Sequence, residues 1–340
     1  MSYTEILSRR RAEIMGIAAL IVVLAHSYAA LPIPGWHYLI IRNPAMVIDF
    51  FALLSAFCGV CSLEKRPDSP AFYLRRLKRM LPAYYVGVAL YALAGGITTD
   101  AMLAGHIVPL CVWTEATWST FWYVPAALLY YMIIPIVHRA MKDARHPVAL
   151  YRGLLALAIL PLPLATRGTT ASIALMRVHS VITGTALGVF HHTHRVREAR
   201  LRDLIWLAAL YAAGFALMTR RGALARLPIS LWDDHQLGYL HKGLRAPLVA
   251  VALAYGFELA ERTPLRRVNR ALRALGARSM ELYAVHVPIR HALRARLGMT
   301  GAPLMLAMLA LSIPLAFALS ELTARLVSRA EPRAPINRAE

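Results

Sequence analysis

Several ionisable side chains lie inside apolar stretches that are long enough to cross a membrane. His26 lies in the stretch 14–31, Asp49 lies in the stretch 43–62, and Arg177 lies in a third stretch. An ionisable side chain inside a membrane-spanning helix costs about 2.5–3.5 kcal/mol on insertion scales, so each one needs a structural or functional reason. At a rise of about 1.5 Å per residue, all three lie about 7–10 Å from the same side of the membrane. We therefore expect them to form one polar layer.

This polar layer allows two interpretations. A histidine oriented by a neighbouring carboxylate is a common form of general base, so His26 would be the base and Asp49 its orienting group. The alternative is a buried polar network that only holds helices together. His26 and Asp49 lie on consecutive apolar stretches joined by a short loop, which favours neighbouring helices.

A basic cluster precedes a proline at the edge of the next apolar stretch. It holds Arg75, Arg76, Lys78 and Arg79 within five positions. On a helix Arg79 shares one face with both Arg75 and Arg76, at spacings of four and three residues. Guanidinium groups match phosphate oxygens geometrically, so the cluster can form a phosphate site. The alternative is a topogenic cluster that binds anionic lipid headgroups.

The overall composition indicates that a membrane helix bundle must position these groups. The chain has 340 residues, of which 58% are hydrophobic and 16% are charged, and its mean hydropathy is +0.51. Soluble domains have about 45–50% apolar and about 25% charged residues. A disordered chain and a disulfide scaffold are both excluded, since the chain is rich in apolar residues and has only three cysteines.

Apolar stretches bounded by charges, glycine or proline predict an all-α polytopic membrane bundle of about ten transmembrane helices. The ten stretches are 14–31, 43–62, 81–97, 121–137, 148–165, 170–190, 204–219, 246–261, 279–297 and 302–324. We assign 1–325 to this transmembrane domain and 326–340 to a short basic cytoplasmic tail.

The distribution of charge predicts the orientation of the bundle. If the N-terminus lies inside, the inner segments hold 27 lysines and arginines and the outer segments hold 7. Basic residues accumulate on the cytoplasmic side of membrane proteins, so both termini are expected to be cytoplasmic. The net charge of +20 is then explained without a nucleic-acid partner.

Two other features receive a structural interpretation. Cys58 and Cys61 form a C-x-x-C pair inside an apolar stretch without a second pair, which indicates core packing, and no metal is expected. The longest outer loop, about 220–245, mixes aromatic and acidic residues. It suits either an interfacial aromatic belt or a carbohydrate-binding surface.

Taken in order along the chain, five motifs resemble those of the membrane acyltransferase-3 family. They are a first stretch that reaches His26, an Asp-Phe-Phe segment that starts at Asp49, the basic cluster before Pro82, an aromatic segment at 121–123, and a Ser-x-Glu-Leu-Tyr-x-x-His motif at 279–286.

This resemblance implies ten spans, an acyl-CoA donor used from the cytoplasm, and acylation of a hydroxyl on a carbohydrate or glycosylated acceptor. His26 would be the acyl-transfer residue. Arg76 and Arg79 would fill the family's Arg-x-x-Arg near the donor phosphates, while Tyr283 and His286 would fill the C-terminal motif.

One departure concerns the donor site. The family usually has an arginine eleven positions before the histidine, where this chain has Met15. Arg11 lies one helical turn earlier on the same face, so it is expected to take over this donor contact.

The sequence thus predicts an O-acyltransferase of the cytoplasmic membrane, of bacterial type, with acetyl-CoA the favoured donor and with membrane lipids around it. His26, Asp49, Tyr283 and His286 are the expected catalytic residues. Arg11, Arg75, Arg76 and Arg79 are the expected donor-binding residues. The competing hypothesis is a transporter or flippase for a glycan or anionic substrate, because intramembrane His, Asp and Arg also mark transport pathways.

Overall fold

The computed structural model describes residues 2–27, 44–159, 168–193 and 234–330, together with residues 166, 205 and 209. In these ranges every regular element is helical and no β-strand occurs. The all-α prediction is therefore confirmed for the described part of the chain.

The helices follow one another with short connections. Their bounds are α1 (Tyr3–Ser27), α3 (Pro44–Lys65), α4 (Ser69–Leu93), α5 (Asp100–Ile107), the 3-10 turn η1 (Glu115–Thr117), α6 (Tyr123–Asp143), α7 (Pro147–Ile159), α9 (Ser172–Leu175), α10 (Val178–His192), α13 (Asp234–Ala260), α14 (Arg266–Ala277), α15 (Ser279–Leu297) and α16 (Gly301–Ala330).

Five segments in the described ranges are long and apolar enough to cross a membrane. They are Met46–Lys65, Tyr123–Asp143, Ser172–His192, Lys242–Ala260 and Gly301–Leu326. Each coincides with one of the ten stretches expected from the sequence. The chain is therefore a membrane protein with at least these candidate spans.

The other expected stretches have different outcomes. Helices α1, α4 and α15 occupy three of them and have spanning length, but more charges than the five apolar segments. Helix α7 covers only 13 residues of the stretch 148–165. The stretch 204–219 and the outer loop to residue 241 fall almost wholly outside the part whose side chains are described. The tail 326–340 is described only to Ala330, where α16 ends.

Helix α4 begins earlier than the apolar stretch 81–97 suggests. Asp68 caps its N-terminus, since Asp68 Oδ1 accepts a hydrogen bond from the Ala71 backbone N–H at 3.2 Å. The basic cluster and Pro82 consequently lie inside one continuous helix. The arginines are therefore held on a rigid element and not on a loop.

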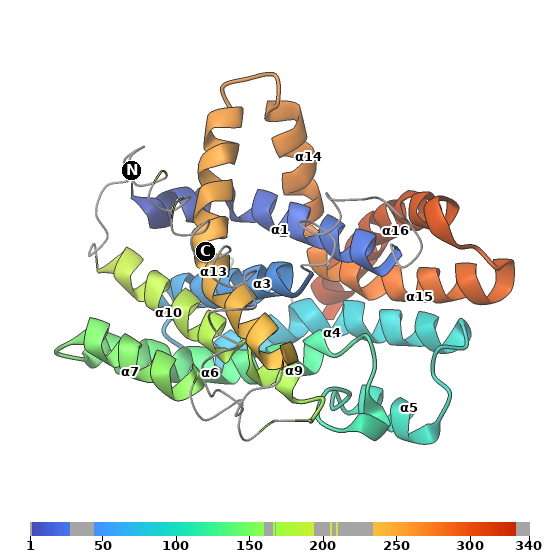
Figure 1. Cartoon of the computed structure of the whole chain (residues 1–340), viewed down its shortest axis with the longest axis horizontal. Helices are drawn as coiled ribbons and strands as arrows, with labels where there is room; N and C mark the ends of the chain where they lie inside the picture. Colours follow the sequence, from blue (N-terminus) through green and yellow to red (C-terminus); the bar gives the residue numbers. More distant parts are fainter. Residues whose placement is uncertain are drawn as a thin grey trace, which may run out of the picture.

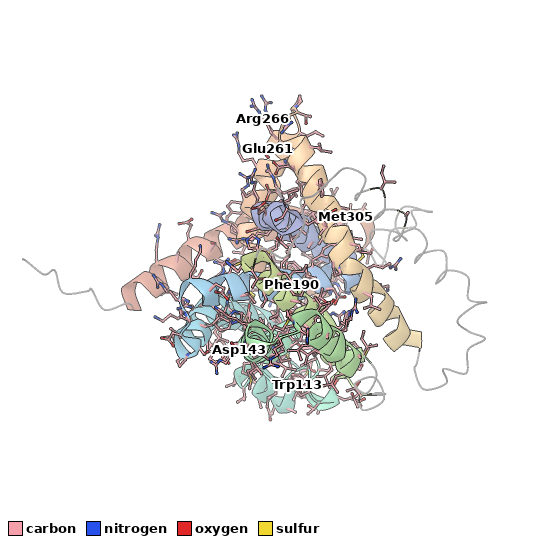
Figure 2. All side chains as sticks on the ribbon, turned by 90° about the vertical axis from the view of Figure 1, so that its left-hand side faces the viewer. Trp113, Asp143, Phe190, Glu261, Arg266 and Met305 are labelled. Carbon is pink, nitrogen blue, oxygen red and sulfur yellow. The ribbon has the colours of Figure 1, made fainter. Side chains whose placement is uncertain are left out.

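Helix α1 lies at the centre of the bundle and packs against α14, α13, α3 and α15. In Figure 1, α13 and α14 rise together above the other helices, and α15 and α16 lie side by side at one end. Figure 2 shows Glu261 and Arg266 at the tip that connects α13 to α14. Small residues allow this close packing: a Cβ on Gly16 or Gly276 would overlap backbone carbonyl groups of the facing helix.

An ion-pair network fixes the N-terminal part of α1. Arg10 is buried and donates to Glu258 Oε2 at 2.7 Å, to Glu261 Oε2 at 2.6 Å and to Glu13 Oε1 at 3.2 Å. Arg273 on α14 also donates to Glu13 Oε1, at 2.7 Å. Buried charges need such pairing because an unpaired one would be strongly destabilising. The network therefore sets the position of the next residue, Arg11.

Candidate active site

A cavity of about 350 Å³ lies between α1, α3, α4, α6 and the junction of α14 with α15. Its walls are mostly apolar. Arginines line one part of it, and tyrosines and a histidine line another. The arrangement combines a cationic region with a region that contains titratable groups.

Three arginines form the cationic region of the cavity: Arg11 on α1, and Arg76 and Arg79 on α4. Arg76 donates to the Cys58 carbonyl at 3.3 Å, and Arg79 donates to the Ala277 carbonyl at 2.7 Å. A guanidinium carries five N–H donors, so these single bonds orient the side chains and leave further donors for a ligand.

Arg75 lies apart from this group. It does not line the cavity, and its guanidinium donates to Ser62 Oγ at 3.4 Å. The sequence placed it on the face of Arg79, but Arg76 and Arg79 point into the cavity and Arg75 points toward α3. The expected set of arginines around the cavity is therefore Arg11, Arg76 and Arg79.

Met15 lines the same cavity as Arg11. The two residues are four positions apart on α1, which places their side chains on one face. Arg11 therefore lies where the sequence comparison expected a substitute for the missing arginine.

His26 and His286 are neighbours at the far end of α1 and in the middle of α15. His286 Nε2 lies 3.3 Å from His26 Nδ1, and the ring centroids are 4.9 Å apart. His286 is fully buried and lines the cavity, while His26 lies beside it and is half-buried.

The hydrogen bonds around this pair indicate which nitrogen of His26 carries the proton. His26 Nδ1 also lies 2.9 Å from the Val22 carbonyl, so Nδ1–H is the donor. His286 Nδ1 lies 2.8 Å from the Tyr283 carbonyl, which leaves its Nε2 as the acceptor that faces His26. With both Nδ1 atoms protonated, the lone pair of His26 lies on Nε2 and can accept a proton or attack an acyl group.

Tyr283 connects the histidine pair to the aromatic segment that precedes α6. Its hydroxyl donates to the Thr120 carbonyl at 3.0 Å and accepts from the Tyr123 backbone N–H at 3.2 Å. Both tyrosines line the cavity. The two motifs that the sequence analysis quoted separately thus form one wall.

Asp49 does not contact His26, which corrects the expectation that it orients this histidine. Asp49 is fully buried on the side of α3 that faces α10. Ser180 donates to Asp49 Oδ1 at 2.7 Å, and His179 Nε2 lies 3.3 Å from the same hydroxyl. Equal depth in the membrane fixes only the position along a helix axis, and α3 turns Asp49 away from the histidine pair.

The cavity follows α1 from Arg11 toward His26. Met15, Ala19, Val22 and Val23 line it between these two residues. Fifteen residues of helix correspond to about 22 Å at about 1.5 Å per residue. A long, thin ligand with an anionic end would therefore match the distance between the arginines and the histidine pair.

Sequence reasoning included His286 but did not pair it with His26, and it gave Tyr123 no role. The spacing of three residues between Tyr283 and His286 was a usable signal, because it places both on one face of a helix. Within the described ranges no group of three or more His, Cys, Asp or Glu side chains could hold a metal ion.

Comparison with known proteins identifies the family. The sequence profile of the acyltransferase-3 family, described as an acyltransferase domain, matches residues 15–321. The chain is also similar to a protein of Acidianus two-tailed virus named "Putative acetyltransferase ORF330", with 26% identity over 149 residues, which cover 40% of this chain and 42% of that protein. No solved structure matches the chain.

The family profile covers almost the whole chain, including the cavity and both histidines, and confirms the family expected from the motifs. The chain belongs to the acyltransferase-3 family and is a membrane acyltransferase.

Proposed function

We propose that the protein is an O-acyltransferase that moves an acyl group from cytoplasmic acyl-CoA to a hydroxyl of a carbohydrate or glycosylated acceptor. The observation that carries this proposal is one cavity that joins Arg11, Arg76 and Arg79 to His286 and, through it, to His26. The acetyl group is the favoured cargo, because the viral relative is named an acetyltransferase.

The arginine end would bind the phosphates of the donor. Coenzyme A is an anion whose phosphates lie at one end of a long arm that ends in the thioester. Guanidinium groups form short, charge-assisted hydrogen bonds to phosphate oxygens. With the phosphates on Arg11, Arg76 and Arg79, the arm can extend along α1 and bring the thioester toward the histidine pair.

His26 would perform the transfer. In one route its Nε2 removes the proton of the acceptor hydroxyl, the oxygen attacks the thioester carbonyl, and the coenzyme A thiolate leaves and takes up the proton. In the other route Nε2 attacks the thioester first and carries the acyl group for a short time. Both routes need the tautomer that the bonds from His26 Nδ1 to Val22 and His286 favour.

His286 and Tyr283 are positioning residues in this proposal. His286 accepts from His26 Nδ1, and the Tyr283 carbonyl holds the ring of His286. Asp49 has no part in the transfer step, because its contacts lie on α10.

The topology that agrees with this chemistry has ten spans in the cytoplasmic membrane of a bacterial-type cell, with both termini inside. It places the arginines of α4 next to the cytoplasm, where acyl-CoA is made. It also places the histidine pair nearer the opposite side, where a cell-envelope glycan would be reached.

The experiment is an assay of the purified protein with radiolabelled acetyl-CoA. We expect time-dependent release of coenzyme A, with the label transferred to added glycan or to water. Arg296→Gln is a suitable control, since Arg296 donates to the Leu93 carbonyl and does not line the cavity. A purified protein that moves glycans across vesicle membranes and never consumes acyl-CoA would be a transporter, and the proposal would be wrong.

A further inference from the structure

A second cavity of about 350 Å³ lies beside the second half of α15. Arg290, His291 and Arg294 line it from α15, and Tyr91 and Thr120 line it from α4 and from the segment before α6. In contrast to the first cavity, polar atoms contribute nearly half of its surface. It therefore suits a polar ligand.

Its positive charge is not balanced by acidic groups of the described residues. No Asp or Glu lines the cavity, and neither Arg290 nor Arg294 forms a salt bridge to a described carboxylate. Arg290 Nε is buried and lacks a hydrogen-bond partner among the described residues. Because a buried donor without an acceptor is costly, this site favours a ligand that supplies anionic oxygens.

The two cavities follow one another along α15, and the histidine pair lies between them. Ser279, Met280, Tyr283 and His286 line the first cavity, whereas the second begins at the next residue, Val287. Tyr283 Oη donates to the carbonyl of Thr120, which lines the second cavity, so this hydrogen bond crosses the wall between them.

The second cavity is also close to the proposed reaction centre. Arg290 is one helical turn beyond His286, and its charge interacts electrostatically with both His286 and His26. A molecule bound there by one end could place another of its groups at the histidine pair. The donor would enter from the arginines of the first cavity, at the opposite end of α15.

We propose that the second cavity binds an anionic group, a phosphate or carboxylate, of the acyl acceptor. This inference rests on the proposed acyl transfer and narrows its acceptor to sugars or glycans that carry such a group. Anchoring one end of the acceptor on Arg290 and Arg294 would hold its hydroxyl near His26, which favours transfer by proximity. A neutral sugar would lack this anchor.

Binding measurements test this proposal without relying on catalysis. Glucose 1-phosphate and glucose serve as probes, and the protein is held in dodecyl maltoside, whose headgroup is uncharged. Arg76→Gln with Arg79→Gln is introduced first, so that phosphate binding in the first cavity does not contribute. We expect glucose 1-phosphate to bind in this background and glucose to bind much more weakly.

Arg290→Gln with Arg294→Gln, added to the same background, should weaken glucose 1-phosphate binding about tenfold to hundredfold, the range expected for lost charge-assisted bonds. Arg294 is exposed, so Arg294→Gln alone should fold and should show part of this loss. Arg296→Gln removes the same charge from the same helix outside the cavity, and should leave binding unchanged. Equal affinity in all variants would overturn the proposal.

A lipid headgroup is the other source of such an anion. The same variants are therefore compared in phosphatidylcholine nanodiscs with and without phosphatidylglycerol. If Arg290→Gln with Arg294→Gln abolishes retention of phosphatidylglycerol but leaves glucose 1-phosphate binding intact, the site holds a lipid only and the proposal is wrong. If glucose 1-phosphate binds as expected but acyl-CoA is never consumed, the proposed transfer function fails and the anion site remains.

Discussion

Replacing His286 by phenylalanine separates a positioning residue from the residue that transfers the acyl group. Phenylalanine keeps a ring in a fully buried position, so the change removes the hydrogen bond to His26 without opening a large cavity. His26 Nδ1 keeps its bond to the Val22 carbonyl at 2.9 Å. The orientation of His26 should therefore be weakened but not lost.

The size of the effect follows from this geometry. A neutral hydrogen bond contributes about 0.5–1.5 kcal/mol, and about 1.36 kcal/mol corresponds to a factor of ten in rate. His286→Phe should therefore lower kcat/KM about two- to thirteen-fold. Removal of a general base typically costs about 10²–10⁴-fold, which is well outside this range.

The assay is steady-state release of coenzyme A, with the donor Kd measured in parallel to show that the variant is folded. His106→Phe is the matched control. His106 is also fully buried, is bonded to the Met102 carbonyl of its own helix at 2.6 Å, and does not line the cavity. A loss in His286→Phe as large as in His26→Ala would make His286 itself the transfer residue. Unchanged activity would show that the contact does not matter.

Three further predictions follow from the donor site and the packing of α1. Arg76→Ala with Arg79→Ala should raise the KM for acyl-CoA at least tenfold while expression stays normal, and lysine should not restore it, because an ammonium lacks the planar fork; unchanged KM with poor membrane insertion would mean that the cluster is topogenic. Gly276→Ala should destabilise the protein by about 1–3 kcal/mol in thermal unfolding, because its Cβ would overlap a backbone carbonyl of α1, whereas Gly256→Ala, where no atom lies within 4 Å, should not. Hydrogen bonds from Asn and Arg side chains hold the pKa of Glu261 below its ordinary value of 4.5, so its contribution to stability should be complete above that pH and be lost as the pH falls through the lowered value; an equal difference in Tm between wild type and Glu261→Gln at pH 7 and pH 3 would contradict this.

Much of the arrangement around α1 could be predicted from the sequence, because local helix geometry determines it. A spacing of four residues is sufficient to place Arg11 on the face of Met15, and a spacing of three places Arg76 beside Arg79. The structure finds these three arginines around one cavity. The apolar stretches likewise predicted the helices, since burial in lipid requires their composition.

The contacts between distant helices could not be predicted in this way. Counting residues from a membrane surface gives depth, which is equal for His26 and Asp49, but it does not give the side of the helix that a residue occupies. That side depends on which helices pack together: α3 presents Asp49 to α10, and α15 presents His286 to His26 from 260 positions away. The single sequence contains no signal for such a pairing.

The central claim is that His26 transfers the acyl group which the donor cavity delivers. The most direct measurement is single-turnover transfer from radiolabelled acetyl-CoA by His26→Ala, together with the donor Kd of the same preparation. The account predicts that transfer falls at least about 10²-fold while donor binding stays within about twofold of wild type, because Arg11, Arg76 and Arg79 are untouched. Transfer at the wild-type rate by a folded His26→Ala protein that binds the donor would contradict it.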